Sequence, residues 1–98
     1  MNGLTPAQTE RFGKLSEEMC EAGQVLGKIQ VHGTHPSCEG IQYDNTTDLE
    51  RELGDVLTAI DLLAAAGDIN MDRVKAFRDK KRKTIFRYLV HQQGIVLP

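Results

Sequence analysis

The chain has 98 residues, of which 40% are hydrophobic and 27% are charged, and its formal net charge is −2. A net charge this close to zero gives no general attraction to nucleic acid or to an anionic membrane, and no apolar run approaches the roughly 20 residues that span a bilayer. We therefore expect neither a nucleic-acid partner nor a membrane partner.

Chain length and cysteine content narrow the class of protein further. A chain of 98 residues corresponds to a single domain, residues 1–98, with a modest core and a large exposed surface, which favours oligomerisation. Two cysteines, Cys20 and Cys38, are too few for a disulfide scaffold. Because the amino terminus also lacks the charged-then-apolar pattern of a signal peptide, we expect a cytoplasmic protein with free thiols.

The first predicted helix begins at Thr5-Pro6. Threonine is a typical N-cap residue, and proline is favoured at the first helical position because its missing N–H costs nothing there. Apolar residues recur at helical spacing to about Ile29. Gly27 leaves open an alternative in which the helix ends or kinks earlier, since glycine weakens a helix relative to alanine.

Residues 31–45 form a loop by composition, because glycine, proline, serine and asparagine are frequent there. His32, His35 and Cys38 recur within this loop at a regular spacing, which suggests zinc. A structural zinc site normally takes four ligands in recognised spacings, and no fourth candidate is evident. We therefore predict no zinc site, and we expect these residues to be solvent-exposed or to lie at the edge of a substrate site.

A second helix is predicted after this loop. Thr47 and Glu50 have the spacing of a capping box, in which the two side chains bond each other's backbone N–H groups, so Thr47 is the predicted N-cap. The helical pattern continues to Ala66. Gly67 then ends the helix, because glycine adopts positive φ without strain.

A third helix is predicted from Met71 to about Gln93, with Asn70 as its N-cap and Gly94 as its end. Its sequence is strongly basic between residues 73 and 87, whereas acidic residues dominate the earlier part of the chain. With three predicted helices and no predicted strand, the chain belongs to the all-α class.

Two acidic clusters lie in the first two predicted helices. Glu18 and Glu21 are three residues apart, as are Glu52 and Asp55, so each pair lies on one side of its helix. At about 100° per residue, the first pair lies about 70° and 130° from the centre of the apolar stripe of its helix, and the second pair about 60° and 120° in the same rotational sense. Antiparallel packing of the stripes would bring all four carboxylates to one groove. The stripes are Phe12, Leu15, Met19, Ala22, Leu26 and Ile29, and Leu49, Leu53, Val56, Ile60 and Leu63.

Four carboxylates in one groove have a specific chemical consequence. Any one of them alone would be read as an ordinary surface residue, but together they repel, and one would take up a proton unless a cation were present. Mg²⁺ prefers oxygen ligands and keeps several waters or phosphate oxygens in its shell. We therefore predict that these four acids bind Mg²⁺, with Mn²⁺ as a substitute, and that the substrate is phosphorylated.

The same residues resemble the signature of a known family. Glu17-Glu18-x-x-Glu21, followed after a loop by Glu52-x-x-Asp55, resembles that of the MazG-like all-α nucleoside triphosphate pyrophosphohydrolases, relatives of the dimeric dUTPases and of phosphoribosyl-ATP pyrophosphohydrolase. The resemblance covers roughly residues 4–89. It implies an antiparallel helical bundle completed in a homodimer or homotetramer. It also implies Mg²⁺-dependent cleavage of a nucleoside triphosphate between the α- and β-phosphates, giving a nucleoside or deoxynucleoside monophosphate and pyrophosphate.

The resemblance implies catalytic roles for all five acids of the signature. Glu18, Glu21, Glu52 and Asp55 would bind the metal. Glu17 lies about 100° around the helix from Glu18, so it would orient the attacking water, act as a general base or hold a second metal through water.

The resemblance also implies substrate contacts. The phosphates would be bound by Lys75 and by Arg82 or Lys83, while Lys28, in the segment Lys28-x-x-x-x-Gly33 that also resembles the family, would be a further substrate-binding residue. Many relatives carry an asparagine in the third helix where this chain has Asp79. The loop between the first two helices would lie near the base and sugar, with His32, His35 or Tyr43 in contact, or would be an inert surface.

Two alternatives remain open from the sequence. One is a relative of narrower specificity, such as a dUTPase, a dCTPase or a phosphoribosyl-ATP pyrophosphohydrolase. The other is a non-catalytic helical interaction module, in which the basic third helix binds an acidic partner.

Overall fold

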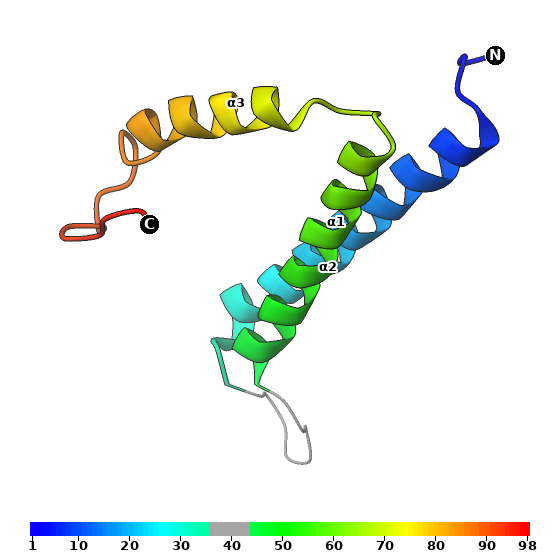
Figure 1. The fold of residues 1–98 in the computed structure, drawn as a ribbon. Coiled ribbons are helices and arrows are strands. Elements are labelled where there is room, and N and C mark those ends of the chain that lie inside the picture. Colours follow the sequence, from blue (N-terminus) through cyan, green and yellow to red (C-terminus); the bar gives the residue numbers. More distant parts are fainter. Residues whose placement is uncertain (36–43) are drawn as a thin grey trace. The chain divides into compact units, whose positions relative to one another are not determined.

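The computed structural model describes residues 1–35 and 44–98, and these residues form three helices and no strand (Figure 1). This part of the chain is all-helical, as predicted. None of its helices is long enough and apolar enough to cross a membrane. The helices are α1 (Pro6–His32), α2 (Asn45–Ala65) and α3 (Met71–Thr84).

The chain divides into two compact units by its internal contacts. Unit 1 is Met1–Asp68 and contains α1 and α2, whereas unit 2 is Ile69–Pro98 and contains α3. A single domain over residues 1–98 stays a prediction.

Helix α1 begins as predicted and extends further than expected. The Thr5 side chain accepts a hydrogen bond from the Gln8 backbone N–H at 3.1 Å, and the Gln8 side chain accepts one from the Thr5 N–H at 2.9 Å, which completes a capping box. The helix passes Gly27 without ending and stops at His32. Gly33 follows with a φ of 79°, a conformation that glycine adopts without strain.

The start of α2 differs from the prediction. Its N-cap is Asp44, whose carboxylate accepts a hydrogen bond from the Thr47 backbone N–H at 2.7 Å, so the predicted capping box at Thr47 and Glu50 is wrong. Asp44 is as good an N-cap as threonine, and starting there adds Asn45 to the first turn. Propensity alone does not choose between these two caps, and the start at Asp44 places Asn45 where its side chain bonds the end of α1.

Asn45 is a buried polar residue that ties the start of α2 to the end of α1. Its side-chain amide donates to the backbone oxygens of Gly33 and His35, at 3.0 and 3.2 Å, and its backbone N–H donates to Thr34 O at 2.8 Å. These bonds satisfy every donor of a residue that is only 7% exposed. Residues 33–35 are therefore fixed against the first turn of α2.

Helix α2 ends within one residue of the prediction. Gly67 has a φ of 82°, and its N–H donates to Ala64 O at 3.1 Å, while the Asp68 N–H donates to Leu63 O at 2.9 Å. This pair of bonds is a Schellman motif. It turns the chain so that the Asp68 carboxylate reaches back to Arg11, near the start of α1.

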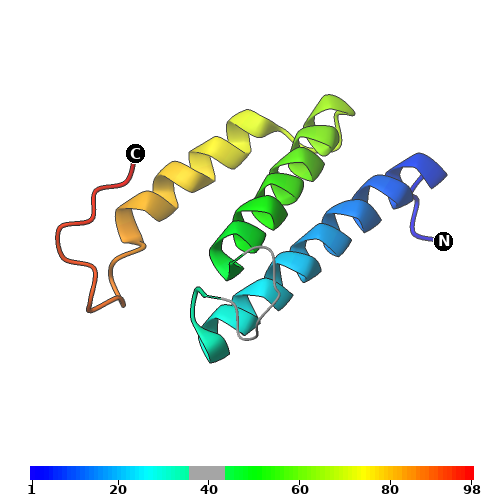
Figure 2. The ribbon, with the colours of Figure 1, turned by 90° about the horizontal axis from the view of Figure 1, so that it is seen from below.

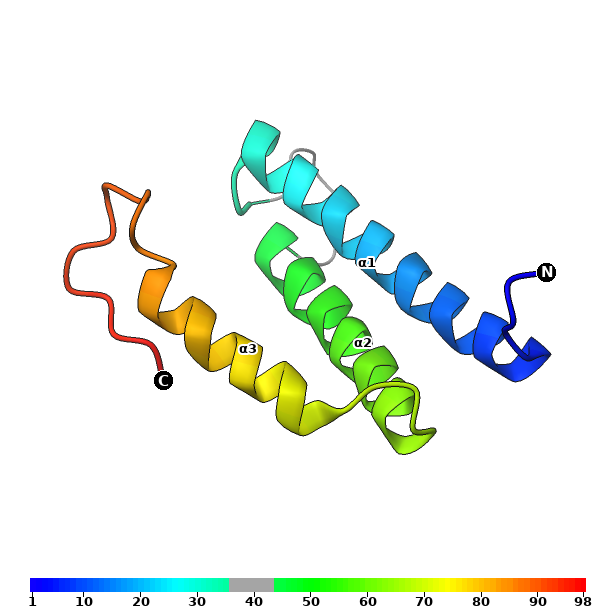
Figure 3. The ribbon, with the colours of Figure 1, turned by 90° about the horizontal axis from the view of Figure 1, so that it is seen from above.

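Helices α1 and α2 form an antiparallel pair. Arg11 binds Asp68 through two hydrogen bonds at one end, and Asn45 binds Gly33 at the other. The start of each helix is therefore close to the end of the other. Figure 2 and Figure 3, which view the ribbon from opposite sides, both show α1 and α2 side by side.

The contact between α1 and α2 runs along a different line from the predicted stripes. The buried apolar residues are Ala22 and Val25 on α1 and Ala59 and Leu63 on α2. On both helices the contact line also passes through an acid of the predicted site, Glu18 and Glu52 respectively. An apolar stripe is 100° wide or more, and one neighbouring helix covers only its edge. The predicted stripe residues left exposed are Met19, Leu26 and Leu53.

Unit 2 consists of α3 and a tail. Asn70 caps the helix as predicted, since its side chain accepts from the Arg73 N–H at 3.1 Å. The helix ends at Thr84, well before the predicted end at Gln93. Residues 84–90 are rich in β-branched and aromatic side chains, which lose rotamer freedom in a helix and favour its end there.

Candidate metal centre

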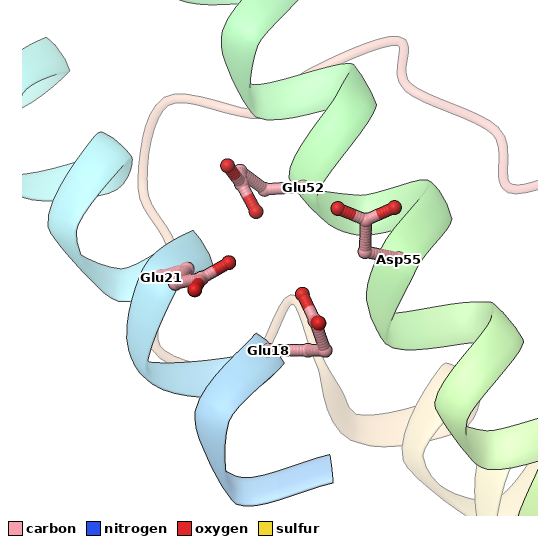
Figure 4. Close-up of side chains that lie close together, drawn as sticks. All are labelled: Glu18, Glu21, Glu52 and Asp55. Atoms are coloured by element: carbon pink, nitrogen blue, oxygen red, sulfur yellow. The ribbon is translucent and has the colours of Figure 1, made fainter. Parts of the chain in front are cut away.

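Four carboxylates meet between α1 and α2. Figure 4 shows Glu18 and Glu21 on α1 pointing toward Glu52 and Asp55 on α2. One oxygen from each lies within 4.8 Å of the others. We call these four residues the carboxylate cluster. Their convergence, predicted from rotational offsets along two antiparallel helices, is confirmed.

The cluster contains buried oxygens that lack hydrogen-bond donors. The Glu18 side chain is only 9% exposed, and Glu21 and Glu52 are half-buried, whereas Asp55 is exposed. Glu18 Oε2 and Glu52 Oε2 are both buried and accept no hydrogen bond from the described residues. An unsatisfied buried carboxylate oxygen is costly, and a hard cation would satisfy it. The donor set therefore fits a cation with oxygen ligands.

Repulsion within the cluster is visible at Glu21. The neighbouring Glu18 charge raises the pKa of Glu21, and burial and the Glu52 charge raise it further. Like charges disfavour the ionised form, so without a cation the cluster holds a proton more readily than an isolated glutamate does. Cation binding would remove that repulsion.

Lys14 is a site residue that the sequence interpretation missed. Its Nζ lies 3.1 Å from Glu18 Oε1 and 3.7 Å from Glu17 Oε2. The bond to Glu18 and the charges of Glu17 and Glu18 raise the pKa of Lys14, so this lysine stays charged at neutral pH. Its spacing of four residues from Glu18 on a predicted helix was the available signal.

A hollow of about 410 Å³ lies beside the cluster. Glu18 and Asp55 line one part of it, Lys14 and Thr58 carry further polar groups, and Ala59 and Leu62 form an apolar part. The volume is within the range of small-molecule sites. The hollow therefore offers room for a ligand next to the carboxylates.

The other predicted residues of unit 1 lie outside the cluster. Glu17 is exposed beside Lys14. Lys28 is exposed on α1, seven residues after Glu21. His32 and His35 are exposed, whereas Cys38 and Tyr43 are outside the described residues.

The predicted phosphate contacts from the third helix belong to unit 2. Lys75 and Lys83 are exposed on α3, and Arg82 donates to Leu97 O at 3.4 Å, which ties the tail to this helix. Asp79 pairs with its neighbour Arg78 on the surface of α3. Contact between these cations and substrate phosphates stays a prediction.

No family model, curated protein or solved structure matches the chain in comparisons with known proteins. A functional assignment therefore depends on the chemistry of the carboxylate cluster and its surroundings.

Proposed function

We propose that this protein is a Mg²⁺-dependent nucleoside triphosphate pyrophosphohydrolase, which cleaves its substrate between the α- and β-phosphates. The observation that carries the proposal is a pair of buried oxygens, Glu18 Oε2 and Glu52 Oε2, which accept no hydrogen bond from the described residues. Their side chains lie beside two further carboxylates, which cannot donate one. Such an arrangement supports cation binding, and Mg²⁺ in protein sites typically bridges carboxylates to substrate phosphates.

The carboxylate cluster would hold the metal, with Mn²⁺ as a substitute. When bound, Mg²⁺ supplies polarisation of the phosphoryl oxygens and compensates charge that develops on them. Glu17 is exposed, lies outside the cluster and has one oxygen beside Lys14, so its other oxygen would orient the attacking water. Glu17 thus has a role distinct from that of the four ligands.

Substrate phosphates need positive charge beyond that of one metal ion. The hollow beside the cluster is lined by Lys14, and we propose that Lys28, Lys75 and Arg82 or Lys83 supply the further positive charge. These residues would come from one chain or from two, because we also propose that the active form is a homodimer or a homotetramer.

The test is a screen of the purified protein against the canonical ribo- and deoxyribonucleoside triphosphates with Mg²⁺, in which pyrophosphate and orthophosphate are detected separately. We expect pyrophosphate release that stops on chelation of the metal. Glu52→Gln should abolish turnover while circular dichroism shows an intact helical fold.

Glu50→Gln is the matched control, because it makes the same chemical change at an exposed position of α2 outside the cluster. It should retain wild-type turnover. A Glu52→Gln enzyme of near wild-type activity would contradict the proposal. Release of orthophosphate alone would mean a different bond is cleaved, and silence across the panel would favour the interaction module.

A further inference from the structure

Lys14 forms ion pairs at the edge of the carboxylate cluster. Its ammonium group lies 3.1 Å from Glu18 Oε1, which is one of the two oxygens of the buried member of the cluster. The other oxygen, Oε2, has no hydrogen-bond donor among the described residues. One Glu18 oxygen is therefore already paired with the Lys14 ammonium group, and the other has no positively charged partner.

Two cations cannot share Glu18 without cost. A divalent ion at the cluster would lie close to the Lys14 ammonium and repel it. Lys14 has an alternative partner, because Glu17 Oε2 is 3.7 Å from the same Nζ and its side chain is 56% exposed. The lysine is itself 53% exposed, so it is free to move toward Glu17 and solvent.

We propose that Lys14 sets the cation affinity of the carboxylate cluster by competing with the metal for Glu18, and that Glu17 receives its ammonium group when the metal binds. Lys14 is then a positioning residue, which keeps Glu18 partly neutralised in the metal-free protein. This inference rests on the metal site of the proposed function, but not on the reaction.

The test is a titration of the full chain with MgCl2, and separately with MnCl2, by isothermal calorimetry without nucleotide. Lys14→Met should bind Mg²⁺ about two- to fivefold more tightly than wild type, the range expected for removal of one competing ion pair. Lys14→Arg keeps the positive charge and should restore wild-type affinity. Lys80→Met is the matched control, because it removes the same charge at an exposed position of α3 that belongs neither to the cluster nor to the proposed phosphate contacts.

Glu17→Gln tests the second half of the proposal. In wild type it should weaken Mg²⁺ binding, since Lys14 then has no alternative partner. In the Lys14→Met background the same change should have a smaller effect, and this coupling is what a double-mutant cycle measures. Equal effects in the two backgrounds would overturn the role of Glu17.

Unchanged or weaker Mg²⁺ binding by Lys14→Met would overturn the role of Lys14, provided circular dichroism shows that the variant is folded. Absence of Mg²⁺ binding in both wild type and Lys14→Met would overturn this inference and the proposed metal site together. A chain that binds Mg²⁺ but releases no pyrophosphate would overturn only the proposed reaction.

Discussion

Glu21 illustrates how a single side chain links the carboxylate cluster to stability. Its pKa is raised by the charge of Glu18 and by burial, so the folded protein binds a proton there more tightly than the unfolded chain does. Lowering the pH through the raised pKa therefore stabilises the native state, and the ionised carboxylate at neutral pH destabilises it. The same proton must leave before Glu21 can bind a cation.

We predict that Glu21→Gln raises the thermal unfolding midpoint of the metal-free protein at neutral pH, because the neutral amide removes one repelling charge. The gain should shrink as the pH falls through the raised pKa of Glu21. Mg²⁺ should stabilise wild type by mass action but should not stabilise the variant. Differential scanning fluorimetry with chelator or with Mg²⁺, over a series of pH values, measures both effects. A variant less stable than wild type in chelator at neutral pH would contradict the prediction.

The four carboxylates could be predicted from the sequence, whereas the lysine beside them was missed. The acids repeat a spacing of three residues on two helices, and this pattern survives moderate errors in where each helix begins. The Lys14 to Glu18 spacing is equally regular, but pairs of this kind are common on helix surfaces. Only the burial of Glu18 distinguishes this one, and burial depends on contact with α2.

Among the elements, the antiparallel pair is closed at one end by Arg11 and Asp68. The Arg11 side chain is 20% exposed and that of Asp68 is 3% exposed, and two hydrogen bonds join them in the fork geometry that favours arginine. The bond from Arg11 lowers the pKa of Asp68. The contribution of this pair to stability is therefore present above the ordinary aspartate value and is lost as the pH falls through the lowered pKa.

We predict that Asp68→Asn lowers the unfolding midpoint at neutral pH by several degrees, since it leaves a half-buried arginine without its countercharge. Asp61→Asn is the control, because Asp61 is an exposed aspartate of α2 and should change the midpoint little. The difference between the two variants should disappear at a pH below the lowered pKa of Asp68. Equal midpoints at neutral pH would show that the pair does not hold the helices together.

Helix ends were predictable where local chemistry decides them. Thr5 with Gln8, and Asn70 with Arg73, make their bonds within one turn, and both starts were predicted correctly. The start of α2 was predicted wrongly, because Asp44 caps the helix in place of Thr47 and Asn45 in its first turn also bonds Gly33 at the end of α1. The line of contact between α1 and α2 was also missed, because it depends on which edge of a wide stripe a neighbour covers.

Unit 1 exposes apolar side chains that a stable monomer would bury. Fractional exposure is 58% for Met19 on α1 and 63% for Leu57 on α2. The buried apolar residues of the pair are small in number and mostly small in size. Contact with further helices, from the same chain or from another copy, would remove these side chains from water.

We predict a homodimer or a homotetramer, detectable by sedimentation equilibrium. Leu57→Lys should shift the distribution toward monomer without loss of helical circular dichroism, because it places a charge in the apolar surface. Gln24→Lys adds a charge at an exposed polar position of α1 and should leave the assembly unchanged. A wild-type chain that sediments as a monomer would contradict the prediction.

Charge is divided between the two units. Twelve of the fourteen acids precede Ile69, and eight of the twelve lysines and arginines follow Asp68. The small net charge of the chain therefore conceals a strongly acidic unit and a strongly basic one. The net charge of the whole chain argued against a general attraction to polyanions. The separation of acidic and basic residues between the two units, however, makes the basic unit suited to bind phosphates or an acidic surface.

The bonds of Asn45 have a consequence for how this protein could diversify. Because one asparagine joins residues 33–35 to the first turn of α2, the two chain ends that border residues 36–43 are held together independently of what connects them. Replacement of that connection by one of another length or composition should therefore leave the carboxylate cluster in place. Evolution, or a protein engineer, could exchange this segment as a cassette without moving the four carboxylates.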